Sequence, residues 1–92
     1  MHAVVVTVNI APGKFEGSRK VLQEEIVPRA KKAPGLVRGY WTVREDSVQG
    51  TSMLVFDSKE HAAGAADMVR SSPPPPGVTL ASIEVREVVA EA

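Results

Sequence analysis

The fold follows from residues 2 to 41, which read HAVVVTVNIAPGKFEGSRKVLQEEIVPRAKKAPGLVRGYW. The segment His2 to Ile10 is rich in β-branched residues and apolar on nearly both faces, which predicts a strand in the middle of a sheet. After a Pro-Gly turn, the apolar residues take helical spacing from Lys14 to about Ala33. A second Pro-Gly pair ends this helix, and the alternating segment Leu36 to Arg44 predicts another strand.

The remaining segments continue the same alternation of strand and helix. A polar loop leads into a strand from Thr51 to Phe56. Asp57 is expected to cap the next helix, Lys59 to Val69, because Glu60 completes the spacing of a capping box. That helix carries alanines on one stripe, which allows close approach to a sheet. The last predicted strand runs from Val78 to Val89.

One residue interrupts the first predicted helix. Pro28 lacks a backbone N–H and its ring clashes with the carbonyl of Glu24. We therefore expect the helix to kink or to end early at this position.

This order predicts an α+β fold of the ferredoxin-like β-α-β-β-α-β type, a four-stranded antiparallel sheet with two helices on one face. The 92 residues give room for one domain, 1–92. Two helices cover only one face, so an apolar strand leaves a large exposed patch on the other. The expectation is a homodimer that packs sheet against sheet.

Composition excludes several classes of function. The absence of cysteine excludes disulfides, zinc–thiolate sites, iron–sulfur clusters and cysteine nucleophiles, and it fits a reducing compartment. Eleven Lys and Arg balance eleven Asp and Glu, so no basic excess indicates nucleic-acid binding. No segment has the roughly 20 apolar residues of a membrane span, and no basic region precedes the first apolar run. We expect a cytoplasmic protein that binds neither nucleic acid nor membrane.

The chain resembles a known family in three motifs: Pro12-Gly13-Lys14-Phe15 after the first strand, Pro34-Gly35-Leu36 before the second, and Asp57-Ser58-Lys59-Glu60 after the third. With the order of elements, these resemble the dimeric α/β-barrel superfamily, most closely its antibiotic-biosynthesis-monooxygenase-like branch. The resemblance spans nearly the whole chain. Its motifs are turns and caps, so they support the fold well and the activity poorly.

The resemblance implies a pocket between the sheet and the helices. Members of the superfamily include cofactor-independent oxygenases of quinol-like and polyketide aromatics, whose substrate itself reduces oxygen in a dry cavity. Other members degrade haem with an asparagine, a tryptophan and a histidine. Thr7 and Ala65 stand about where the first two would be, and no histidine follows Pro73 to Pro76. We therefore expect no haem and no other cofactor.

The best polar candidates for a wall of this pocket are Asn9 and Thr7, which share one face of the first strand. Asparagine is unfavourable in strands, so Asn9 is the first choice for a functional residue, with capping of the strand end as the alternative. Tyr40 and Trp41 point to opposite faces of one strand. One is expected to stack on an aromatic ligand and the other to lie at the dimer sheet, although packing alone also explains both.

Two further residues complete the candidates. Arg38 shares the face of Tyr40, where a salt bridge is the simpler role and an anion contact the functional one. His61, in the first turn of the second predicted helix, is a weak candidate for a general base. A surface or cap-associated histidine is the simpler interpretation, and no second histidine accompanies it to bind a metal.

Three classes of function remain open at this stage. The first is a cofactor-independent, monooxygenase-like enzyme acting on a small aromatic or quinol-like compound. The second is a dimeric small-molecule-binding module without chemistry. The third is a structural or interaction domain in which the dimer face or the run Pro73 to Pro76 matters most. We expect that run to be a stiff spacer; a ligand for a proline-recognition domain is the alternative.

Overall fold

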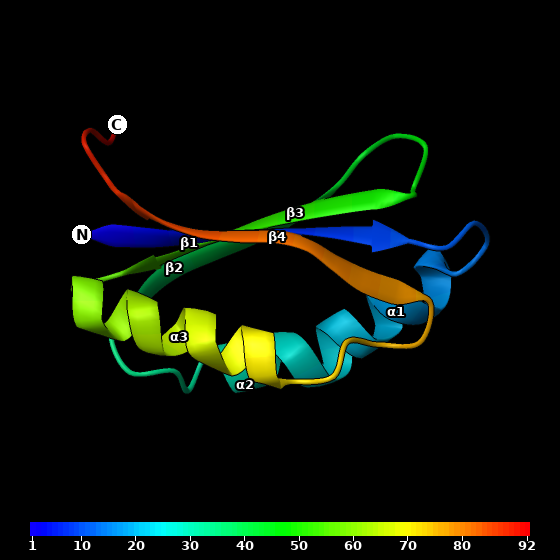
Figure 1. Cartoon of the computed structure of the whole chain (residues 1–92), viewed down its shortest axis with the longest axis horizontal. Helices are drawn as coiled ribbons and strands as arrows, with labels where there is room; N and C mark the ends of the chain where they lie inside the picture. The colour runs from blue at the N-terminus through cyan, green and yellow to red at the C-terminus, as the bar shows by residue number, and fades with distance from the viewer.

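A computed structural model describes all 92 residues, and it confirms the predicted order of strands and helices (Figure 1). The elements, in chain order, are β1 (His2–Ile10), α1 (Phe15–Val21), the π-helical turn η1 (Leu22–Ile26), α2 (Val27–Ala30), β2 (Leu36–Val43), β3 (Gln49–Phe56), α3 (Lys59–Ser71) and β4 (Val78–Glu87). No helix is both long enough and apolar enough to cross a membrane.

The four strands form one antiparallel sheet in the order β2-β3-β1-β4. As predicted, β1 is central: Val4 lies between Leu54 of β3 and Val85 of β4, and Val6 between Ser52 and Ile83. Because side chains alternate along a strand, these residues share one face of the sheet.

All helical segments lie on that one face (Figure 1). The buried cluster joins the sheet to α3 and consists of Val4, Val6, Leu54, Phe56, Ala62 and Ala66. Ala62 and Ala66 are fully buried, as the alanine stripe predicts, and their small side chains let α3 lie close to the sheet.

The first helix does not end at Pro28. Instead, its preceding turn widens: the N–H of Val27 donates to the carbonyl of Leu22, five residues back, and the helix continues to Ala30. Pro28 has no N–H to donate, so a wide turn immediately before it is one way to accommodate a missing hydrogen bond. The sequence identified the place of the irregularity but not its form.

The cap of α3 differs from the prediction. Ser58 is the N-cap residue, and its Oγ accepts a hydrogen bond from the N–H of His61 at 3.2 Å. Asp57 instead accepts a bond from the imidazole Nδ1 of His61 at 2.7 Å. The assignment was wrong by one residue because both types are good caps and the sequence does not show which has extended backbone.

The helix-free face of the sheet is mixed in character. Val5 and Val55 are half-buried there, and Met53 and Tyr40 are 47% and 57% exposed. Toward the other end of the strands the same face is polar, with Thr7, Thr42, Thr51 and Ser82 in adjacent positions. Its apolar part is therefore smaller than the sequence suggests.

Candidate ligand-binding site

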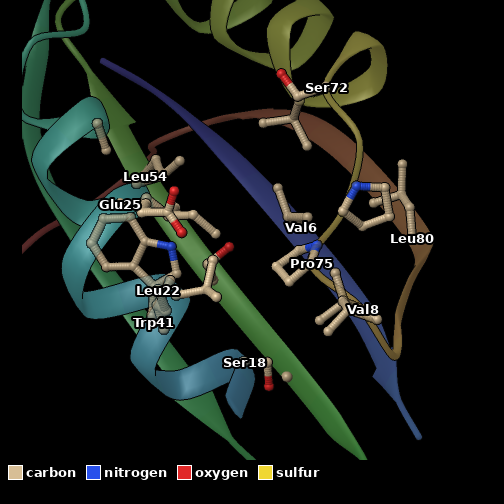
Figure 2. Close-up of a pocket in the computed structure, with 18 of the residues that line it drawn as sticks. Val6, Val8, Ser18, Leu22, Glu25, Trp41, Leu54, Ser72, Pro75 and Leu80 are labelled. Carbon is tan, nitrogen blue, oxygen red and sulfur yellow. The ribbon is translucent and has the colours of Figure 1, made fainter. Parts of the chain in front are cut away.

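A cavity of about 580 Å³ lies between the helix-bearing face of the sheet and the first helix (Figure 2). Of the 33 residues that line it, 19 are hydrophobic. This volume falls within the roughly 300–1,000 Å³ of pockets that hold small organic ligands. The cavity is therefore large enough for a compound of several fused rings.

The cavity exists because the two helical segments pack differently. α3 approaches the sheet closely through Ala62 and Ala66, whereas no residue of α1, η1 or α2 is fully buried. Phe15, Leu22 and Ile26 point apolar side chains toward the sheet yet stay half-buried. The apolar surface of these side chains that no other residue covers forms the outer wall of the cavity.

The π-helical turn shapes this wall. Leu22, Glu25 and Ile26 all belong to η1 and all line the cavity. Figure 2 shows Leu22 and Glu25 on the helix side, close to Trp41. π-turns within helices occur frequently at functional sites, because the extra residue changes which side chains face inward.

Trp41 is the aromatic wall. It lies on β2 opposite Ser52 of β3, on the same face as Val6, and is half-buried. A Cβ on Gly39 would lie 3.3 Å from the Trp41 ring and 2.7 Å from Leu54. The ring therefore covers Gly39, and glycine at this position lets the indole lie flat along its strand.

Polar groups are few in the cavity. Glu25 is the one carboxylate among the lining residues, and no histidine, lysine or tyrosine lines it. Three arginines also line it, of which Arg70 is paired with Asp67 at 3.2 Å. Glu25 makes no ion pair with any residue of the chain. No cluster of three or more histidine or acidic residues is arranged to hold a metal ion.

The predicted site residues separate into two groups. Trp41 lines the cavity, whereas Asn9, Thr7, Tyr40 and Arg38 lie on the helix-free face of the sheet. Their position differs from the expectation because the alternation of β1 places its valines toward the helices. Asn9 is exposed, so its amide is free to bond to water and needs no cavity.

His61 also lies away from the cavity. Its imidazole bonds to Asp57, and both side chains pack over Gly35 at the start of β2. The N–H of Asp57 donates to the carbonyl of Gly35 at 2.9 Å. The hydrogen bond from His61 lowers the pKa of the Asp57 carboxyl below its ordinary value of 3.8. This arrangement joins the turn before β2 to the turn before α3.

Two parts of the cavity were not identified from the sequence. Glu25 is not among the candidates from the sequence, because a regular helix gives no reason to expect this exposed residue beside a cavity. The run Pro73 to Pro76 was expected to be a spacer, yet all four prolines line the cavity. The clue to Glu25 was its position three residues before Pro28, where the helix is irregular.

Two solved structures share this fold. A dimeric ferredoxin-like protein from an uncultured marine organism has a TM-score of 0.69 and 16% identity, over 100% of this chain and 98% of that one. A monooxygenase from the gene ActVA-Orf6 of Streptomyces coelicolor, in complex with nanaomycin D, has a TM-score of 0.59 and 12% identity, over 99% of this chain and 92% of that one. No family model and no curated protein matches the sequence. The ferredoxin-like fold predicted from the sequence is thus confirmed.

Proposed function

We propose that this protein binds a small aromatic compound in the cavity between its first helix and its sheet. The observation that carries the proposal is an apolar cavity of about 580 Å³ with the indole of Trp41 as one wall. Aromatic rings gain about 0.5–1.5 kcal/mol from stacking beyond the burial of their area, so such a wall favours aromatic ligands over aliphatic ones. The S. coelicolor monooxygenase, which has the same fold, was solved with nanaomycin D bound.

Trp41 gives a direct test, because it is the one tryptophan of the chain. A panel of naphthols, naphthoquinols and anthrones is titrated against the protein, and the fluorescence and indole N–H resonance of Trp41 are followed. We expect saturable changes in the wild type. Trp41→Leu lacks this reporter, so its affinity is measured by calorimetry and should be roughly tenfold weaker. Tyr40→Leu, one residue away on the other face, is the matched control and should leave affinity unchanged. Failure of every compound to bind would overturn the proposal.

The reaction that best suits such a ligand is oxidation by O₂ without a cofactor. An electron-rich hydroxylated ring system that carries a CH₂ group would react with O₂ to give C=O and H₂O. The substrate supplies the four electrons that O₂ accepts, so the protein needs to provide a dry site and a base. Glu25 is suited to take the proton from the substrate, because it is the one carboxylate that lines the cavity. The resulting anion would donate electrons to O₂.

Adjacent glutamates make this step testable. Glu25→Gln should abolish most of the oxygen uptake with a quinol or anthrone while leaving its binding near the wild-type value. Glu24→Gln is the control, because both side chains are exposed but only that of Glu25 lines the cavity. Equal oxygen uptake in the two variants would contradict a role for Glu25 as the base.

A second candidate is a binding module without chemistry. The observation that favours it is the lack of any pair of acid and base side chains in the cavity, where Glu25 has no polar partner. Tight binding of the same aromatic compounds, with no oxygen uptake above the rate in buffer, would establish this candidate in place of the enzyme.

We also propose that the protein is a homodimer that packs through the helix-free face of its sheet. Val5, Val55, Met53 and Tyr40 supply an apolar patch on this face that no element of the chain covers. The proposed interface buries more than about 1,000 Å², as specific interfaces do. Light scattering should give twice the monomer mass of 9.8 kDa at micromolar concentration. Met53→Glu should shift the mass to that of the monomer, and a wild-type monomer would contradict the proposal.

A further inference from the structure

The connector between α3 and β4 forms one side of the cavity. Pro73, Pro74, Pro75 and Pro76 all line it. Figure 2 shows Pro75 across the cavity from Trp41, beside Val6 and Val8 of β1. We infer that these four prolines form a fixed wall that limits the thickness of the ligand, so that the cavity selects flat ring systems. The inference rests on the proposed binding of an aromatic compound and specifies its shape.

The wall is anchored where it leaves α3. The N–H of Ser72 donates to the carbonyl of Met68 at 3.0 Å, and the Ser72 hydroxyl donates to the same carbonyl at 2.7 Å. These two bonds fix the direction in which the chain leaves the helix. The first proline of the wall follows immediately.

The other end of the wall is held by a tight turn. The carbonyl of Pro75 accepts a hydrogen bond from the N–H of Val78 at 3.0 Å, with Pro76 and Gly77 at the two central positions. Gly77 has a φ of 80°, and proline followed by such a glycine is typical of a type II turn. The carbonyl of Gly77 in turn accepts from the N–H of Ala11 at 2.7 Å, which ties the turn to the end of β1.

Between its two anchors the wall has little freedom to move. Each proline ring fixes its φ near −65°, and a proline run prefers an extended conformation without internal hydrogen bonds. Pro75 and Pro76 face the first helix across a second, smaller cavity of about 270 Å³, which Lys14, Gly17 and Val21 also line. A wall held at both ends does not need to be ordered when a ligand binds.

This arrangement places an indole and stiff pyrrolidine rings on opposite sides of one cavity. On this inference, the ligand lies between them and is thin in one direction and broad in the other two. A puckered ring system with the same carbon skeleton is thicker and would have to displace one wall. A flexible connector would move aside for the thicker molecule, whereas an anchored run of prolines would keep its position.

The test compares two probes that share a skeleton, flat 2-naphthol and puckered decahydro-2-naphthol. Binding of each is followed through the indole N–H resonance of Trp41. The wild type is expected to prefer 2-naphthol. Pro74→Ala/Pro75→Ala should weaken 2-naphthol binding roughly five- to tenfold and reduce the preference between the probes, because the wall gains freedom. Pro75→Ala alone should show a smaller change in the same direction, and thermal unfolding confirms that each variant is folded.

The control is Pro34→Ala, which also removes a proline from a turn but at a position that does not line the cavity. It should leave both affinities unchanged. If the wild type binds neither probe and no member of the aromatic panel, the proposed function itself fails. If the wild type binds 2-naphthol but the proline variants keep its affinity and its preference, the proposed function stands and the wall has no role in selection.

Discussion

Gly35 offers a sharp test of how the turn before β2 is tied to the turn before α3. Gly13 and Gly35 each follow a proline, and each has a positive φ, of 79° and 78°. Their surroundings differ: a Cβ at Gly13 meets no atom within 4 Å, whereas a Cβ at Gly35 collides with the His61 ring and the Asp57 carboxylate. Changing each glycine to alanine therefore separates backbone strain from collision.

The expected magnitudes follow from these surroundings. An alanine with left-handed backbone costs about 1–2 kcal/mol, and reduced freedom of the unfolded chain offsets about 0.4–1 kcal/mol of this cost. Gly13→Ala should therefore destabilise the protein by about 1 kcal/mol. Gly35→Ala adds the cost of crowding, about 1–3 kcal/mol, and should destabilise it by about 2–4 kcal/mol in total. That is a large share of the roughly 5–15 kcal/mol that stabilises a typical domain.

Urea unfolding measures both changes, followed by the fluorescence of Trp41 and by circular dichroism at one fixed protein concentration. With a slope of about 1–3 kcal/mol per molar urea, the two midpoints should differ by roughly 0.3–3 M. The variant that combines Gly35→Ala with His61→Ala should recover part of the loss, since it removes the group that the new methyl meets. Equal midpoints for Gly13→Ala and Gly35→Ala would refute the argument.

Three further changes probe the core and the charges. Val6→Asp puts an unpaired charge on the buried face and should cost roughly 3–5 kcal/mol in urea unfolding, whereas Asn9→Asp, in an exposed position of the same strand, should cost little. Ala66→Leu should destabilise by about 1–3 kcal/mol through overpacking against the sheet, as judged by the melting temperature, and exposed Ala63→Leu should be near neutral. Because its pKa is lowered in the folded state, the Asp57 carboxylate stabilises the protein above pH 3.8 and loses this effect as pH falls through the folded pKa. The stability difference between the wild type and Asp57→Asn should therefore shrink in strong acid, and a difference independent of pH would contradict the role of this carboxylate.

Hydrophobic periodicity was sufficient to predict the fold. Every strand begins and ends within two residues of its predicted limits, and the central place of β1 is confirmed. Periodicity works here because helix and strand bury side chains at different spacings, and that difference depends on local sequence alone. It also predicted that Tyr40 and Trp41 face opposite ways, but not which of them faces the helices.

The site was less predictable, for a physical reason that Asn9 illustrates. A polar residue in a strand indicates a cavity only if it lies on the buried face of the sheet. Because side chains alternate between the two faces, assigning a strand's residues to the wrong face reverses the conclusion. The valines at the even-numbered positions of β1 face the helices, so Asn9 and Thr7 face away. Glu25 is exposed and lines the cavity from the π-turn, and the form of that turn depends on hydrogen bonds that no residue pattern specifies.

The cavity stays open because the segments around it are held in place at several points, and the side chains that line it are not large enough to fill it. The alanines of α3 set a short distance between that helix and the sheet, but the first helix is placed by the turns at its two ends. One turn contains Gly13, and the other is held to α3 by Gly35, Asp57 and His61. The four prolines occupy the remaining side and cannot fold inward, because their rings restrict the backbone and their ends are anchored. Collapse of the first helix onto the sheet would require breaking one of these ties, so the space beside Trp41 remains open to a ligand.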